Sequence, residues 1–378
     1  ADAIRRENAA IFAFFAAEGY IRGMDKYGKR QTGYIWQREE WPRFSWDLER
    51  LITPLAEVRS LQGKLQGAMA MLGFESRGNA ALDAMTSDLV SSSAIEGVAL
   101  NADSVRSSVA RKLGLDNEGL VATDHYVEGL VEVMTDAAVN SCVPLTAERL
   151  FGWHAALFPL GRSGMRRITV GGWRIGDEPM QVVSGAMGRE KVHYEAPPSD
   201  RVADEMALFF DWAASAKCDP VLCAAVAHLW LVSIHPFDDG NGRISRTVAD
   251  YFLSRADGMG QRYYSMSAEI LREKREYYEI LERTQKGGLD ITEWVLWFLG
   301  CLRNALLRSY GTVERTLQKA EYWEAHREAE VNERQRKIIN RLWDGFDGKL
   351  TTSKWAKICH CSTDTALRDI NDLIGKGI

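Results

Sequence analysis

The sequence predicts a mainly α-helical protein with one short β-hairpin and a smaller helical module at each end. Three observations predict this fold. Apolar residues recur every three to four positions over much of the chain, as they do on one face of a helix. A glycine-rich stretch at residues 161–198 interrupts that spacing and contains two strand-like runs. Ser, Thr and Gly stand where several of the helices should begin and end.

The N-terminal part divides into a leader and a helical module. Residues 1–33 form the leader and have no clear pattern. Residues 34–46 gather aromatic side chains around Pro42, which favours an extended segment that helps to form a core. Residues 47–113 follow helical spacing, so we expect an N-terminal helical module at 34–115. Its periodic apolar positions begin with Leu48, Leu51, Leu55, Val58, Leu61 and Leu65.

The central domain is expected at residues 116–302. Helical patterns cover residues 124–139, 146–158, 201–214 and 220–234. Strand-like runs at 179–184 and 191–194 form a hairpin if residues 185–190 join them. The helix at 220–234 is apolar on nearly every side and should be buried, with His235 at its C-terminal end. Further helices follow from Ile244 and near residues 273–285 and 294–302.

The C-terminal part contains a helical connector at 303–333 and a small module at 334–378. The module has nine Lys or Arg and five Asp, a balance of +4. Its pattern of helix, short turn and helix resembles a winged helix-turn-helix module, whose second helix should begin near Thr363. The resemblance implies docking to DNA or to a protein. The modest charge and the aspartates of the second helix favour the protein.

Composition limits the class of protein. A net charge of −5 over 378 residues argues against broad nucleic-acid binding by the whole chain. No apolar stretch is long enough to span a bilayer. The six cysteines are scattered and form no disulfide framework, which favours a reducing, cytoplasmic location. Cys359 and Cys361 flank His360 but have no second cysteine pair, so we expect no zinc site.

The segment from His235 to Arg246, HPFDDGNGRISR, is the most informative part of the chain. It combines an imidazole, two carboxylates, a glycine turn and two guanidiniums. Gly240 and Gly242 allow the chain to turn at the start of a helix, where backbone N–H groups and the helix dipole bind phosphate. Arg243 and Arg246 lie three residues apart, on one face of that helix. These groups suit the binding and chemistry of a nucleoside triphosphate.

This segment resembles the signature of the Fic family, His-x-Phe-x-Asp/Glu-Gly-Asn-Gly-Arg-x-x-Arg, at every defined position. The resemblance implies a Fic helical bundle with a β-hairpin flap. It also implies transfer of AMP from ATP to a Ser, Thr or Tyr hydroxyl of a protein, with release of pyrophosphate. His235 would be the catalytic base and Asp239 the ligand of Mg²⁺. The residues expected to bind ATP phosphates are Asp238, Gly240, Asn241, Gly242, Arg243 and Arg246.

A second segment, from Ser92 to Gly97, resembles the inhibitory motif of the same family, Ser/Thr-x-x-x-Glu-Gly/Asn. It lies at the expected C-terminal end of a helix. The resemblance implies that Glu96 pairs with Arg246 and takes the place of the ATP γ-phosphate. The physical basis is that a carboxylate and a phosphate accept the same hydrogen bonds from a guanidinium.

The resemblance implies further contacts and partners. By spacing, Tyr278 and Gln285 are the candidates to border the adenine, although the family usually has Asn where this chain has Gln285. The hairpin would align a target protein, or the protein itself, by strand pairing. A homodimer is also implied. The hairpin residues expected to take part are Gln181, Val182, Val183, Val192 and His193.

Other activities remain open at this point. Fic relatives also transfer other phosphate-containing groups or remove AMP, and an intact His235 and Asp239 suit each reaction. A transcription regulator that senses nucleotide through its Fic-like domain and acts through residues 334–378 would not need His235.

Overall fold

The structure is a computed structural model, which describes residues 33–115, 125–184, 189, 191–258, 260–343, 345–346 and 348–378. Nearly all of the expected leader, and most of the segment 185–190, lie outside the described residues. Helices dominate, which confirms the predicted mainly α fold. The helices are α2 (Leu48–Met71), α3 (Phe74–Ile95), α4 (Ala102–Leu113), α5 (His125–Val139), α6 (Ala147–Leu157), α7 (Val202–Ser215), α8 (Pro220–Ile234), α9 (Asn241–Asp257), α10 (Met266–Arg272), α11 (Lys274–Gln285), α12 (Thr292–Ala325), α13 (Glu333–Trp343), α14 (Thr352–Cys359) and α15 (Thr363–Gly375).

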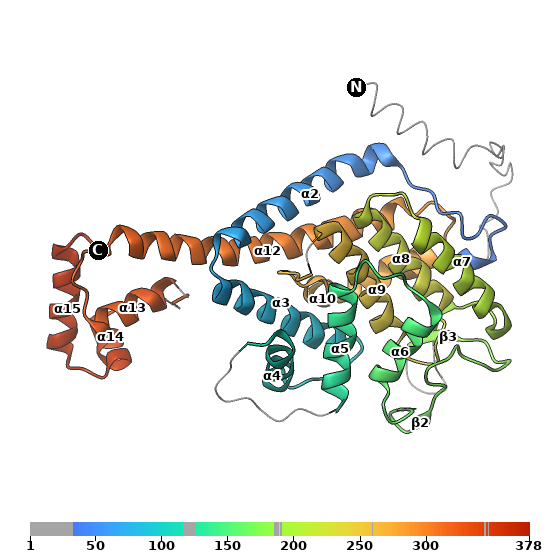
Figure 1. The fold of residues 1–378 in the computed structure, drawn as a ribbon, viewed down its shortest axis with the longest axis horizontal. Helices are drawn as coiled ribbons and strands as arrows, with labels where there is room; N and C mark the ends of the chain where they lie inside the picture. The colour runs from blue at the N-terminus through green and yellow to red at the C-terminus, as the bar shows by residue number, and fades with distance from the viewer. Residues whose placement is uncertain are drawn as a thin grey trace. The chain divides into compact units, whose positions relative to one another are not determined.

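Helix α8 occupies the centre of the main bundle. Every residue from Val221 to Ile234 is buried, as the apolar sequence of this segment predicts. Helix α9 packs along α8, and α7 and α12 also contact it (Figure 1). One hydrophobic core extends from Ile35 to Val313. The N-terminal helices and the central helices therefore share a single core.

Helices α2 and α12 lie side by side along the bundle (Figure 1). Arg50 pairs with Glu293 at 2.7 Å, and Arg303 pairs with Glu57 at 2.5 Å. The pair nearer the start of α2 is also the pair nearer the start of α12, so the two helices run parallel. Helix α12 contains no proline and continues unbroken to Ala325, so the expected boundary at 302/303 falls within one helix.

The start of α8 is fixed by polar and covalent contacts. Asp219 caps the helix by accepting a hydrogen bond from the Val221 N–H at 2.8 Å, and it also accepts one from Arg59 Nε at 3.0 Å. Cys223, in the first turn, forms a disulfide with Cys218. This bridge departs from the expectation of scattered cysteines without a disulfide framework, because a single local pair five residues apart has no framework pattern. A local turn brings the two Cα atoms to 6.1 Å, within bonding range.

The expected hairpin is present as β3 (Gln181–Ser184) and β4 (Lys191–Glu195), which pair antiparallel. A shorter pair, β1 (Arg162–Ser163) and β2 (Arg166–Arg167), precedes it. Val182 lies opposite Tyr194, and Val183 lies opposite Val192. His193 is thus the extra residue of a β-bulge, which is a feature that redirects a side chain.

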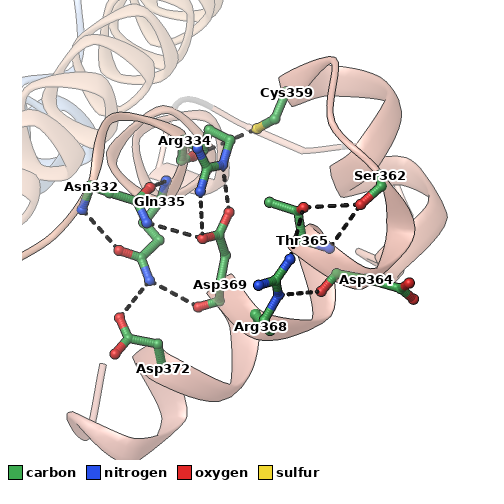
Figure 2. Close-up of polar contacts among 10 residues, drawn as sticks. All are labelled: Asn332, Arg334, Gln335, Cys359, Ser362, Asp364, Thr365, Arg368, Asp369 and Asp372. Atoms are coloured by element: carbon green, nitrogen blue, oxygen red, sulfur yellow. Dashed lines mark hydrogen bonds and ion pairs between the residues drawn. The ribbon is translucent and has the colours of Figure 1, made fainter.

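Helices α13 to α15 surround a second, smaller core that includes Ile338, Trp355 and Leu373. Helix α15 begins at Thr363, as predicted. The buried carboxylate of Asp369 accepts hydrogen bonds from Arg334 Nε at 2.7 Å and Nη2 at 2.9 Å (Figure 2). Gln335 Nε2 donates to Asp372 at 2.8 Å. Two aspartates of α15 are therefore used inside the module, in contacts with α13.

None of the described helices combines the length and the apolar character needed to cross a membrane.

Candidate active site

His235 is placed by the end of α8 and by a loop that crosses it. The residue before a proline avoids the helical conformation, and Pro236 follows. His235 is instead left-handed (φ 54°, ψ 56°), which costs a residue with a side chain about 1–2 kcal/mol. Arg174 holds it there. Its Nε donates to the His235 carbonyl at 2.8 Å, and its backbone N–H donates to the Pro236 carbonyl at 2.9 Å.

The ring of His235 is oriented by a backbone carbonyl of α8. Its Nδ1 lies 3.2 Å from the Val232 carbonyl. A carbonyl only accepts hydrogen bonds, so this contact keeps the proton on Nδ1 and leaves the lone pair on Nε2. Burial lowers the pKa of His235, while the bond to Val232 acts in the opposite direction. The imidazole is thus neutral near pH 7, the form that removes a proton.

The loop after His235 is fixed by Asn241 and Gly240. The Asn241 side chain accepts from the Phe237 N–H at 2.9 Å and donates to the Phe237 carbonyl at 2.8 Å. Gly240 has φ +83°, and a Cβ there would lie 2.8 Å from the Phe158 ring. Glycine is therefore needed both for the backbone conformation and for the close packing. Helix α9 starts at Asn241, so its first-turn amides follow this loop directly.

The two carboxylates of the loop have different surroundings. Asp238 accepts a hydrogen bond from the Thr169 N–H at 2.8 Å. Asp239 accepts one from the Ser163 hydroxyl, and its side chain is 42% exposed. An exposed carboxylate is a suitable oxygen ligand for Mg²⁺ that arrives with a nucleotide, because such an ion needs only one or two protein ligands. The described residues contain no cluster of three or more His, Cys, Asp or Glu side chains that could hold a metal by themselves.

Arg243 lies in the first turn of α9 and faces the loop. Its Nη1 donates to the Tyr126 hydroxyl at 2.7 Å, and its Nη2 lies 3.9 Å from Asp239 Oδ1. The guanidinium also stacks over the Phe158 ring at 4.9 Å. These contacts, from α5, the loop and the end of α6, hold a cation beside Asp239.

Arg246 is buried and is held by the C-terminal end of α3. Its Nη2 donates to Glu96 Oε1 at 2.7 Å and to the Ser92 carbonyl at 3.0 Å, and its Nε donates to Ser92 Oγ at 3.0 Å. Burial lowers the pKa of Arg246, but Glu96 and then Tyr277 and Tyr278 act in the opposite direction, and together they raise the pKa. Gly97, with φ +81°, ends α3 immediately after Glu96.

Gly242 makes room for Glu96. A Cβ on Gly242 would lie 2.2 Å from Glu96 Oε1, closer than any real contact. The carboxylate therefore lies directly against the backbone of the first turn of α9, as well as on Arg246. This is the location where a helix N-terminus attracts a negative group.

Helix α11 carries the two residues expected beside the adenine. Tyr278 is partly exposed and its hydroxyl lies 3.3 Å from the Ile95 carbonyl, at the end of α3. Burial, and then the charge of Glu96, raise the pKa of Tyr278 to about 12. Gln285 is buried and donates to Ser233 Oγ at 3.2 Å. Gln285 thus joins α11 to the last turn of α8, next to His235.

The hairpin is attached to the same helices. The Tyr194 hydroxyl donates to the Ser233 carbonyl at 2.7 Å. The ring of His193 lies between Ser184 Oγ at 2.5 Å and Glu282 Oε2 of α11 at 2.6 Å. Val183 and Val192 remain exposed, and Gln181 donates to Glu195 at 2.9 Å. The structure therefore places β4 against α8 through Tyr194 and against α11 through His193, and His193 is the expected hairpin residue that contacts these helices.

Several residues of the site had no signal in the sequence. Arg174 comes from a glycine-rich loop without periodicity. His154, on α6, is buried under the loop, where its Nε2 donates to the Asp239 carbonyl at 3.1 Å and its ring stacks on Phe237 at 4.3 Å. Glu282 and Tyr126 belong to ordinary helical patterns. Their contacts lie far apart in the sequence, so only the fold reveals them.

Comparison with known families matches two parts of the chain. Residues 144–253 match the model of the Fic/DOC family, and residues 34–115 match a domain of unknown function, DUF4172. A protein adenylyltransferase Fic of Drosophila willistoni is 35% identical over 117 residues, which are 30% of this chain and 22% of that protein. The corresponding protein of Nematostella vectensis is 31% identical over 119 residues, 30% of this chain and 25% of that protein. The chain thus spans about a quarter of the length of these relatives.

Solved structures share the fold over a longer stretch. A Fic family protein from Desulfovibrio desulfuricans superposes with a TM-score of 0.53 and 20% identity, covering 86% of this chain and 89% of that one. A Fic domain containing signaling protein from Bacteroides thetaiotaomicron has a TM-score of 0.51 and 21% identity, covering 68% and 95%. At this level of identity the likeness concerns the fold.

Proposed function

Because residues 144–253 are a Fic domain, we propose that this chain is a protein adenylyltransferase that transfers AMP from ATP to a Ser, Thr or Tyr hydroxyl of a protein. The observation that carries the proposal is the position of His235. A neutral imidazole with its lone pair on Nε2 directly precedes a loop and a helix N-terminus suited to phosphate, with two guanidiniums on that helix.

In the proposed reaction, the hydroxyl oxygen of the target attacks the α-phosphorus of ATP. His235 Nε2 takes the hydroxyl proton, which is worth about 10²–10⁴ in rate. The bond between the α- and β-phosphates breaks, and pyrophosphate leaves with the electron pair. The first-turn amides of α9 stabilise the charge on the α-phosphate, and Arg243 stabilises the leaving pyrophosphate.

Mg²⁺, when bound with ATP, neutralises phosphate charge. Asp239 is the residue that would hold it, because its carboxylate is partly exposed and lies at the start of α9. Asp238 orders the loop through Thr169, and Asn241 orders it through Phe237. These two side chains act on the reaction by keeping the loop in shape.

We further propose that the site is restrained by Glu96. Its carboxylate accepts a hydrogen bond from Nη2 of Arg246, which we assign to the γ-phosphate of ATP, and it fills the space above Gly242. A phosphate and a carboxylate use the same donors and cannot occupy them together. ATP must therefore displace Glu96 to bind in the productive position.

The location and the partners of the chain stay predictions. The predicted location is the cytoplasm. The predicted partners are a second copy of the chain in a homodimer, a target protein aligned by the hairpin, and DNA or a protein bound by helices α13 to α15. Asp369 pairs with Arg334, and Asp372 pairs with Lys376 and accepts a hydrogen bond from Gln335. Two aspartates whose charge argues against DNA binding are therefore neutralised by neighbours within the module.

The function is tested with ATP labelled either at the α- or at the γ-phosphate. We expect the Glu96→Gly variant to incorporate the α-label into protein and not the γ-label, and the Glu96→Gly/His235→Ala variant to incorporate neither. Glu75→Gln, on the first turn of the same helix, is the control and should behave as the wild type. Retention of the γ-label would indicate phosphate transfer instead of AMP transfer. Equal incorporation by the wild type and Glu96→Gly would refute the restraint.

A further inference from the structure

Helix α3 contacts Arg246 through Ser92 and Glu96 at its C-terminal end. It has a second polar attachment at Asp88, one turn before Ser92. Asp88 is on α3 and is 1% exposed. Its carboxylate accepts hydrogen bonds from Ser265 Oγ at 2.6 Å, from the Ser267 N–H at 2.9 Å and from Ser267 Oγ at 3.2 Å. A side chain of α3 thus accepts hydrogen bonds from N–H and hydroxyl groups at the start of α10.

A buried arginine joins this attachment to α9. Arg262, in the loop between α9 and α10, forms an ion pair with Asp250, and its Nη2 lies 3.8 Å from Asp88 Oδ2. Its guanidinium also lies over the Tyr264 ring at 5.3 Å. All three charged side chains are buried, so their attraction is weakly screened by solvent.

The two attachments share the same helix faces. On α3, Asp88 and Ser92 are four residues apart, and on α9 Arg246 and Asp250 are also four residues apart. Residues with this spacing lie one above the other on a helix. Ser92 binds Arg246 directly, and Asp88 reaches Asp250 through Arg262. The end of α3 is therefore fastened to α9 at two successive levels.

We propose that Asp88, with Arg262 and Asp250, positions the end of α3 and so sets how readily Glu96 leaves Arg246. The proposal rests on the proposed restraint of the site by Glu96. ATP binds in the productive position only in molecules in which Glu96 has left Arg246, so its apparent affinity is reduced by the small size of that fraction. Loosening the second attachment raises that fraction, although Asp88 touches no part of the ATP site.

Asp88→Asn is the test variant. Asparagine keeps the shape of the side chain and one carbonyl oxygen that accepts from Ser267, while it removes the charge. Arg262 keeps Asp250 as its partner, so no buried cation is left alone. Asp83→Asn is the matched control, because Asp83 is on the same helix but pairs with Arg106 of α4 at the surface. Ser265→Ala, which removes one hydrogen bond to Asp88 together with the cap of α10, is the second variant should Asp88→Asn fail to fold.

Two measurements decide the proposal, both on the full chain. Amide hydrogen exchange of residues 88–96, followed by mass spectrometry, should be faster in Asp88→Asn than in the wild type or Asp83→Asn. In a His235→Ala background, which prevents turnover, titration with ATP and Mg²⁺ should show about fivefold tighter binding for Asp88→Asn, at the lower end of ordinary coupling between sites. Glu96→Gly should tighten ATP binding further.

The possible outcomes separate this inference from the proposed function. If Glu96→Gly tightens ATP binding while Asp88→Asn and Ser265→Ala match the wild type in both measurements, the second attachment is refuted and the role of Glu96 stands. If Glu96→Gly has no effect but Asp88→Asn still tightens ATP binding, Asp88 acts on the ATP site by another route, and both the restraint by Glu96 and this inference are refuted. If neither variant changes ATP binding, both proposals are refuted.

Discussion

Single side chains decide the chemistry of this site, and the position of His235 depends on one neighbour. Arg174 contributes two hydrogen bonds that hold His235 and Pro236 in a conformation that side chains disfavour. A base misplaced by about 1 Å loses much of its effect. In the proposed reaction, Arg174 is thus a positioning residue that acts through His235.

We expect Arg174→Lys, in the Glu96→Gly background, to lower kcat for AMP transfer by about tenfold while the KM for ATP changes little. Lysine keeps a positive charge but lacks the Nε that binds the His235 carbonyl. Steady-state kinetics with α-labelled ATP measures the effect, and Arg167→Lys, an exposed site in β2, is the control. A rise in the KM for ATP with unchanged kcat would contradict the positioning role.

His228 provides a pH-dependent term in stability. It is buried on α8 with Nε2 at 2.9 Å from the Tyr277 hydroxyl, and burial lowers its pKa from 6.5 to about 3. Because the unfolded state takes up the proton first, the stability linked to neutral His228 is complete above pH 6.5 and is lost as the pH falls towards about 3. Asp250 acts with the opposite sign, since burial raises its pKa to about 7.

We therefore compare variants at each pH rather than follow the wild type alone. Between about pH 7 and pH 4, the melting temperature of His228→Gln should fall less than that of the wild type, because glutamine does not titrate. Thermal unfolding followed by circular dichroism gives both curves. Parallel curves for the two proteins would show that His228 does not titrate on unfolding in this window.

At the scale of elements, the hairpin is fastened to two helices by different means. Tyr194 is buried against the last turn of α8, whereas His193 and Lys191 meet Glu282 on α11 near the surface. Lys286 and His193 lower the pKa of Glu282 to about 2 against the effect of burial, which raises it. Glu282 is thus a charged anchor at neutral pH, on the face of α11 that also carries Tyr278.

We expect Glu282→Gln to increase hydrogen exchange in β3 and β4 by about threefold, since a partly exposed ion pair contributes at most about 1 kcal/mol. The described amides of residues 181–184 and 191–195 would be followed by mass spectrometry. Glu279→Gln, on the exposed side of α11, should leave the exchange unchanged. Unchanged exchange in Glu282→Gln would mean that Tyr194 alone holds the hairpin.

The elements were easier to predict than the contacts between them. Apolar spacing and caps predicted the type and approximate limits of α8, the approximate starts of α9 and α15 and the C-terminal end of α3, because these signals are local. The hairpin followed from residue types on either side of a glycine-rich turn. The bulge at His193 and the connection of Glu282 to the hairpin depend on how α11 packs, and no short stretch of sequence records that packing.

The candidate site divides in the same way. One motif of twelve residues contains His235, Asp239, Arg243 and Arg246, so the sequence alone predicts their chemistry. Glu96 was found through a second motif far from the first. Arg174 and Asp88 belong to no motif. Arg174 contacts His235, more than 60 residues away in the sequence, and Asp88 contacts Ser265, more than 170 residues away. Such contacts require the folded chain.

At the scale of the whole chain, the described residues form two main hydrophobic cores and a small cluster of Trp36, Tyr194 and Ala196. The larger core extends from Ile35 to Val313, and the smaller lies among α13, α14 and α15. The larger and the smaller core share no buried side chain. We therefore expect the C-terminal module to unfold as a unit of its own.

Asp369 tests this division. Asp369→Asn weakens the contacts with Arg334 and Asn332 and should destabilise the module by about 2 kcal/mol, with no effect on the main bundle. Asp364→Asn, on the exposed start of the same helix, is the control (Figure 2). Hydrogen exchange resolved by segment would show faster exchange confined to residues 333–378. Faster exchange in α8 or α9 as well would contradict the independence of the two cores.

In the proposed mechanism, ATP and Glu96 compete for Arg246. The most direct measurement is a crystal structure of the Glu96→Gly/His235→Ala variant with ATP and Mg²⁺. We predict that the γ-phosphate lies within hydrogen-bonding distance of the Arg246 guanidinium, where the Glu96 carboxylate lies in the present structure, with the α-phosphate facing position 235. ATP bound with its phosphates away from Arg246 would contradict the account.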